Sequence, residues 1–218
     1  MTRQSARKRT AEAAPQTTAR EQLLRATGAV MTERGTTEVS FSEIAQRSGV
    51  NSALIKYYFG NKDGLFLELV RQVLAPSVAQ LQKLVTMPYS PKEKLRIHLS
   101  GVVNSYFRFP YINRLMHQLL AGSEESRRII AEEFVRPVVA AQQAILEEGQ
   151  AAGAFRPIEP MLFYFHVNGA CDHLFFSAYA LKYVFGVQFI GEDLRRRYVE
   201  QLYDIIVRGI EMDESPIA

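Results

Sequence analysis

Apolar residues recur at intervals of three and four along almost the whole chain, which is the pattern of amphipathic helices. The pattern breaks at glycines, prolines and short polar stretches, and these mark the ends of the predicted elements. In chain order, the expected helices cover residues 19–34, 41–48, 52–59, a segment from 62 that Pro76 bends or interrupts, 91–107, 111–121, 124–150 with a break or kink near Pro137, 159–183 and 192–212. No stretch alternates as a strand would. The sequence therefore predicts an all-α fold of about nine helices.

The segment 40–62 predicts two short helices joined by a tight turn. Ser40 followed three residues later by Glu43 is a capping box, which starts a helix. Gly49 suits the positive φ just past a helix end, and Asn51 suits the N-cap of a second helix. This order of signals is typical of a helix-turn-helix, whose second helix enters the major groove of DNA. The alternative is an ordinary helical hairpin whose polar face is solvated.

Several outward residues of this segment suit contacts with nucleic acid. Lys56 and Lys62 can meet phosphates, and Tyr57 can reach a phosphate or a thymine methyl group. Asn51 and Ser52 can form hydrogen bonds with base edges or backbone oxygens. These contacts predict that the second helix faces DNA.

The distribution of charge supports the same interpretation. Residues 1–62 carry 10 Lys and Arg against 5 Asp and Glu, a balance of +5, whereas residues 63–218 carry 16 against 18, a balance of −2. The excess of positive charge in this N-terminal part favours a polyanionic partner. Residues 1–17 are expected to be a disordered basic arm, either a solvated tail or an arm that follows DNA. Residues 213–218 are expected to be a C-terminal tail.

The segment 161–183 is apolar around nearly its full circumference, so every side of it must be covered. A membrane span is the alternative, but polar residues such as Asp172 interrupt the segment and disfavour it. We instead expect a homodimer formed by this segment and the last helix. The predicted interface residues are Phe176, Leu194, Tyr198, Leu202, Ile205 and Ile206. Two-fold symmetry in the dimer predicts a palindromic operator on double-stranded DNA.

The remaining chemistry points to a ligand-binding domain rather than a catalytic one. No metal-binding or catalytic motif occurs, so neither a metal nor a cofactor is expected. Helices packed around aromatic residues can enclose a cavity for a small-molecule effector. Its candidate polar contacts are Tyr106, His117, His166, Asn168, Asp172 and Tyr179. The single cysteine, Cys171, allows no intramolecular disulfide and fits a cytoplasmic location.

Within residues 19–70, the stretch TTEVSFSEIAQRSGVNSALIKYYFGNKDGLF resembles the helix-turn-helix of the TetR family of transcriptional regulators. The resemblance implies a three-helix DNA-binding domain at 18–62 and a larger helical ligand-binding and dimerisation domain at 63–212. It also implies a repressor that a small molecule releases from DNA. The family's DNA-facing positions fall on Ser40, Ser42, Asn51, Ser52, Ala53, Lys56, Tyr57 and Lys62. Tyr58 and Phe59 map to positions that mostly pack, and many members carry an aromatic residue in place of Lys56.

Two hypotheses of different classes follow. The first is a dimeric DNA-binding regulator, with no enzymatic activity, that a small molecule controls. The second is a helical enzyme or small-molecule carrier whose N-terminal domain only resembles a helix-turn-helix.

Overall fold

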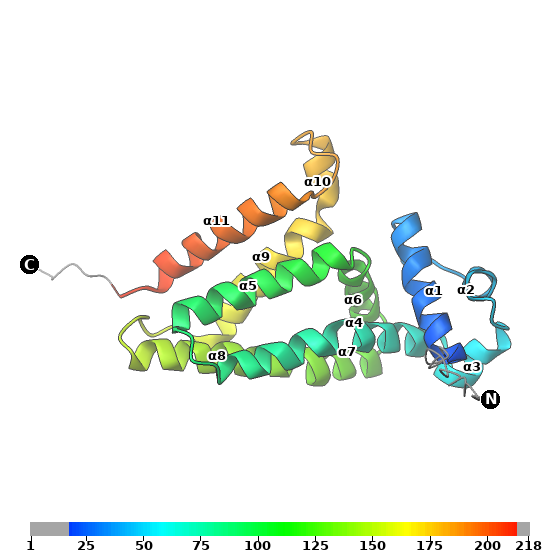
Figure 1. The fold of residues 1–218 in the computed structure, drawn as a ribbon, viewed down its shortest axis with the longest axis horizontal. Helices are drawn as coiled ribbons and strands as arrows, with labels where there is room; N and C mark the ends of the chain where they lie inside the picture. The colour runs from blue at the N-terminus through cyan, green and yellow to red at the C-terminus, as the bar shows by residue number, and fades with distance from the viewer. Residues whose placement is uncertain (1–17, 213–218) are drawn as a thin grey trace, which may run out of the picture.

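The computed structural model describes residues 18–212, and helices make up most of them (Figure 1). The expected arm at 1–17 and tail at 213–218 lie outside the described residues. The elements in chain order are α1 (Ala19–Arg34), α2 (Phe41–Ser48), α3 (Ala53–Phe59), α4 (Lys62–Val85), α5 (Pro91–Arg108), α6 (Ile112–Ala121), α7 (Glu124–Ile130), the π-helical turn η1 (Ala131–Val135), α8 (Arg136–Ala151), α9 (Pro160–Phe176), α10 (Ala178–Tyr183) and α11 (Glu192–Ile210). Residues 18–212 contain no strand, and the predicted all-α class is confirmed.

Two of the predicted helices are divided. The segment 124–150 contains the π-helical turn η1 immediately before Arg136 and Pro137. Pro137 has no N–H to give to the preceding turn, so the expected break falls where the regular hydrogen bonding must change. The segment 159–183 is interrupted at Ser177, whose φ of −93° and ψ of 30° end α9.

Of the two alternatives predicted at Pro76, a bend or an interruption of α4, the interruption is absent. The proline neither ends the helix nor splits it, and α4 continues over 24 residues to Val85. Pro76 lies on the exposed side of the helix, so water can satisfy the carbonyl that loses its partner. The apolar side continues beyond the proline, because Leu81 and Leu84 are buried against α8.

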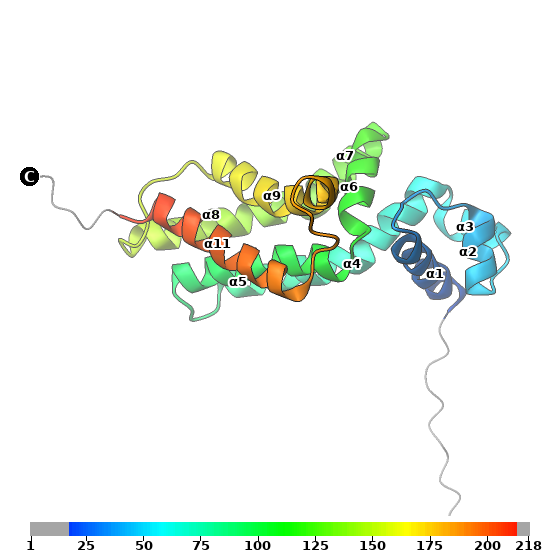
Figure 2. The same cartoon turned by 90° about the horizontal axis from the view of Figure 1, so that it is seen from above.

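Helices α1–α3 form one end of an elongated molecule, and α4 runs from them into the remainder (Figures 1 and 2). A first hydrophobic core contains buried residues of α1, α2, α3 and the first half of α4 together with α6, Ile130 and Phe134. A second core joins α5, α8, α9 and α11. The N-terminal helices therefore share their core with α6 rather than having one of their own.

The junction between α3 and α4 depends on Gly64. A Cβ atom at this position would lie 2.1 Å from the backbone oxygen of Phe59, at the end of α3. Asn61 caps α4 beside it, with its Oδ1 accepting a hydrogen bond from the Gly64 N–H at 2.8 Å. Only glycine lets the start of α4 lie this close to α3.

We predict that Gly64→Ala lowers the free energy of unfolding by about 1–3 kcal/mol, because α3 must move away from α4. Chemical denaturation monitored by circular dichroism measures the change. The matched control is Gly209→Ala in α11, where a Cβ atom meets nothing within 4 Å. The control should instead be stabilised by up to about 1 kcal/mol, because alanine favours a helix. Equal stability of the two variants would contradict the close contact at Gly64.

Candidate DNA-binding surface and effector cavity

The turn between α2 and α3 is built as its sequence predicts. Both halves of the Ser40–Glu43 capping box are present at the start of α2. Gly49 has a φ of 70° and its N–H donates to the carbonyl oxygen of Ala45 at 3.0 Å. Asn51 Oδ1 accepts from the Ala53 N–H at 2.8 Å and so caps the start of α3. Ile44 and Ile55 are fully buried, which fixes the two helices on α1.

The opposite face of α3 points to solvent. Ser52, Ala53 and Lys56 are exposed, and the side chain of Tyr57 is 78% exposed. Ser42 is also exposed at the start of α2. Ser42, Ser52 and Lys56 have no side-chain hydrogen bond or ion pair within residues 18–212. This face is free to bind another molecule.

The other predicted contacts either have a partner within the chain or are less exposed to solvent. Ser40 Oγ donates to Glu43 Oε2 at 2.7 Å, and this bond is the main reason that the pKa of Glu43 is lowered. Asn51 uses its oxygen in the cap, which leaves its amide N–H groups for a partner. Lys62 is half-buried, with its Nζ 5.5 Å from the centroid of the Phe66 ring.

Tyr58 does not pack inward fully. It is 39% exposed and contacts the rings of Tyr57 and Phe59 edge to face. Phe59 is half-buried against the first core, as expected. The aromatic group at the end of α3 therefore presents two rings to solvent rather than one.

A cavity of about 630 Å³ lies between α4, α5, η1 and α9. Its walls are mainly apolar, with Leu81, Leu84, Val102, Met116 and Phe134 among them. A volume of this size suits a small organic ligand.

The polar groups of the cavity are mostly neutral. Ser77 and Ser105 lie opposite each other, with their Oγ atoms 3.2 Å apart. Burial is the main cause of the raised pKa of Tyr106, so its hydroxyl stays protonated. Burial also lowers the pKa of His98 to about 4, and its Nε2 lies 2.8 Å from Gln142 Nε2, which keeps the ring neutral near pH 7. The charged residues of the lining are Lys83 and Arg108, both exposed.

The structure separates the six candidate ligand contacts into three groups. Tyr106 and Asn168 line the cavity. His117 and Asp172 instead pair with each other, with His117 Nε2 3.0 Å from Asp172 Oδ2, and Asn113 donates to the same carboxylate. That network joins α6 to α9 outside the cavity lining. His166 and Tyr179 are exposed and do not line the cavity.

The second half of α4 supplies cavity residues that are not among the predicted ligand contacts, including Ser77 and Leu81. They follow Pro76, where the sequence predicts a bend or an interruption of the helix. The signal was present, because Val73, Leu81 and Leu84 continue one apolar side past the proline.

The predicted interface residues differ in their exposure to solvent. Phe176 is 47% and Ile205 62% exposed, so both can meet a second copy. Leu202 is buried in the second core, Tyr198 and Ile206 pack against it, and Leu194 is half-buried. Tyr198 also donates from its hydroxyl to the carbonyl oxygen of Ala170 at 2.6 Å, which holds α11 on α9.

The exposed side of α9 carries apolar residues that were not predicted as interface residues. Met161, Leu162 and Phe165 are 54%, 49% and 64% exposed.

Among residues 18–212, none of the helices has the length and apolar character of a membrane span. The same residues contain no group of three or more potential metal ligands.

Both the N-terminal helices and the larger C-terminal part of the chain match known protein families. The family model described as "Bacterial regulatory proteins, tetR family" matches residues 23–69, and the one described as "Tetracyclin repressor-like, C-terminal domain" matches residues 88–215. The HTH-type transcriptional repressor NicS of Pseudomonas putida is 24% identical over 198 residues, which are 88% of this chain and 92% of NicS. The HTH-type transcriptional regulator BetI of Stenotrophomonas maltophilia is 42% identical over 55 residues, which are only 25% of this chain and 28% of BetI.

A similar fold occurs in the crystal structure of the transcriptional regulator FadR from Bacillus subtilis in complex with stearoyl-CoA. The TM-score is 0.69 at 21% identity, and the match covers 87% of this chain and 98% of FadR. Identity this low shows a shared fold alone.

We predict that His98 makes the fold sensitive to acid. The unfolded chain binds a proton at His98 near pH 6.5, whereas the folded chain does so only near pH 4, so the free energy of unfolding falls as the pH drops between these values. Between pH 7 and pH 5 the loss is about 2 kcal/mol. Urea denaturation of wild type and His98→Gln at both pH values measures it. The variant should lose less stability on acidification, and His166→Gln, at an exposed position, should match wild type. An equal loss in all three proteins would contradict the prediction.

Proposed function

The chain belongs to the TetR family of transcriptional regulators, and we propose that it is a cytoplasmic, dimeric repressor that a small-molecule effector releases from its operator. In this proposal, residues 18–62 bind double-stranded DNA and residues 63–212 bind the effector and the second copy. The observation that carries the proposal is the exposed face of α3. Ser52, Lys56 and Tyr57 lie on this face, and buried Ile55 fixes the opposite face of the helix to the fold.

DNA binding is favoured over the enzyme or carrier hypothesis by the polarity of that face. A helix whose outward residues are small, basic and aromatic can approach base edges and phosphates at once. An enzyme or carrier would have no need for this face, and the family is one of transcriptional regulators. The proposed contacts are Ser42, Asn51, Ser52, Ala53, Lys56, Tyr57 and Lys62, with Ser40 acting mainly as the cap of α2.

The cavity between α4 and α9 is the proposed effector site. Its apolar walls and neutral polar groups fit a mainly apolar ligand that carries one or two hydrogen-bonding groups. Helix α4 lines the cavity with its second half and packs against α1–α3 with its first half. Met116 of α6 lines the cavity too, and α6 shares the first core. An effector that favours a different position of α4 or α6 would therefore change the position of α3.

The proposed dimer uses the exposed side of α9 together with α11. Leu162, Phe165 and Phe176 lie on that side, and Gly169 lies between them, so a partner helix can approach closely. Ile205 adds an exposed apolar residue on α11. Two copies related by a two-fold axis would present two α3 helices to successive major grooves.

We predict that Lys56→Gln weakens binding to all DNA sequences and lowers the salt dependence of binding. Removing one phosphate contact should reduce the slope of log K against log salt by about 0.9. Fluorescence anisotropy with DNA from the region upstream of the gene, at several salt concentrations, measures both effects. Lys83→Gln, at an exposed lysine on the same chain far along α4, should leave the slope unchanged. Identical slopes for wild type and Lys56→Gln would remove α3 from the proposed interface.

We predict that Phe165→Glu converts the dimer to a monomer, because a charge replaces an apolar residue at the centre of the proposed interface. Sedimentation velocity measures the change, and DNA affinity should fall with it. The control is Leu120→Glu on α6, since Leu120 is also partly exposed, at 39%. A dimer that survives Phe165→Glu but dissociates in the control would place the interface elsewhere.

A further inference from the structure

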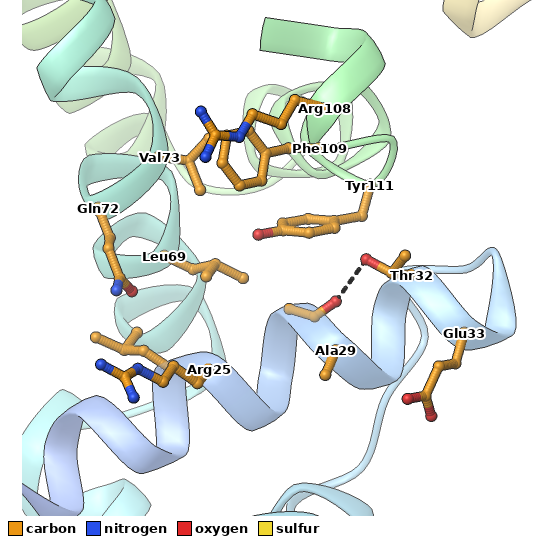
Figure 3. A pocket seen from close by; sticks show the side chains of 12 residues that line it. Arg25, Ala29, Thr32, Glu33, Leu69, Gln72, Val73, Arg108, Phe109 and Tyr111 are labelled. Atoms are coloured by element: carbon orange, nitrogen blue, oxygen red, sulfur yellow. Dashed lines mark hydrogen bonds between the residues drawn. The ribbon is translucent and has the colours of Figure 1, made fainter. Parts of the chain in front are cut away.

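A second cavity, of about 590 Å³, lies between α1, the first half of α4 and the corner that joins α5 to α6 (Figure 3). It is separate from the proposed effector cavity and lies where the N-terminal helices meet the rest of the molecule. Leu24, Leu69 and Val73 form its apolar walls. Its volume is within the range of small-molecule sites.

Tyr111 places an unpartnered hydroxyl in this cavity. The residue is only 8% exposed, and its hydroxyl makes no hydrogen bond within residues 18–212. Its oxygen would lie 2.8 Å from a Cβ atom at Gly28, so the ring is held against α1. Figure 3 shows the hydroxyl pointing into the space between α1 and α4. The hydroxyl oxygen is not among the fully buried side-chain atoms that lack a partner, so it reaches the open space of the cavity, where a ligand can accept a hydrogen bond from it.

The hydroxyl is available as a donor. Burial raises the pKa of Tyr111 to about 12, so the group keeps its proton at every physiological pH. A ligand that meets it must therefore supply an acceptor oxygen or nitrogen.

Arg108 gives the cavity a positive charge. Its guanidinium carbon lies 5.5 Å from the centroid of the Phe109 ring, and it forms no ion pair or hydrogen bond within the described part of the chain. Arg25 adds a second positive charge to the lining. The one acidic lining residue, Glu33, is paired with Arg47 and points away from the cavity in Figure 3.

Aromatic rings complete the site. Phe109 and Tyr111 stand edge to face, with their centroids 6.4 Å apart. Together with the apolar walls they offer a surface for a flat ring, while the charge and the donor lie beside it. An anion with an aromatic body matches each of these features.

We propose that this cavity is a second small-molecule site, which binds an aromatic carboxylate. The ring of the ligand packs against Leu24, Leu69 and Val73. Its carboxylate pairs with Arg108 and accepts a hydrogen bond from Tyr111. Such a ligand touches α1, α4 and the α5–α6 corner at once, so it holds the N-terminal helices in one position relative to the rest.

The site also has a direct connection to the effector cavity. Arg108 and Phe109 line both cavities, and they form the wall between them. A ligand in one cavity that moves this wall changes the shape of the other. Occupancy of the two sites is therefore coupled, and each ligand alters the affinity for the other.

Isothermal titration calorimetry of the full chain with 2-naphthoate tests the site without requiring DNA binding. Tyr111→Phe removes only the unpartnered hydroxyl and should weaken binding about tenfold. Gln72→Trp changes an exposed lining residue of α4 to one that fills the cavity, and it should abolish this binding. The neutral analogue 2-naphthamide should bind at least tenfold more weakly than the carboxylate.

The matched controls are Tyr183→Phe and Gln118→Trp, which make the same changes at exposed residues that line neither cavity. Both should retain the binding that Tyr111→Phe and Gln72→Trp lose. Thermal unfolding of each variant shows whether it is folded. The proposal is overturned if 2-naphthoate does not bind wild type at millimolar concentration. It is also overturned if folded Tyr111→Phe and Gln72→Trp both bind 2-naphthoate as tightly as wild type.

Discussion

The packing of the first half of α4 is the interaction on which the rest of the structure depends. Leu65, Phe66 and Val70 are fully buried, and they lie in a core that contains α1, α2 and α3 on one side and α6 on the other. The N-terminal helices are short and share this core, so they owe their position to α4 and α6. An interior this dense transmits a displacement instead of absorbing it. The position of α3 is therefore set by helices that also line the two cavities.

Because the N-terminal helices share this core, a molecule that binds far from α3 can change the position of α3. The effector cavity contacts the second half of α4 and one residue of α6, whereas the cavity at the domain junction contacts α1 and the first half of α4. Arg108 and Phe109 separate the two cavities. The ion pair between Arg71 and Glu133, with 2.6 Å between Nη2 and Oε1, further ties α4 to η1. The proposed regulation thus needs no mobile element beyond the helices themselves.

The sequence predicted the features that local physics decides. The capping box at Ser40 and the positive φ of Gly49 are present, because each depends on residues within one turn. The all-α class followed from periodicity. The interruption considered at Pro76 is absent, since the effect of a proline depends on whether its side of the helix faces water. The close contact at Gly64 and the unpartnered hydroxyl of Tyr111 could not be predicted, because each depends on where a distant element packs. The same reason explains why only Tyr106 and Asn168 of the six candidate ligand contacts line the effector cavity.

In the proposed function, two copies of the chain bind DNA together through their α3 helices. Selection of binding sequences from a random pool of double-stranded DNA tests it most directly, because the operator does not have to be identified beforehand. We expect enrichment of one inverted repeat whose half-sites lie about 10–10.5 base pairs apart, centre to centre, or a multiple of that spacing. Recovery of no enriched sequence, or of a single unrepeated site, would contradict it.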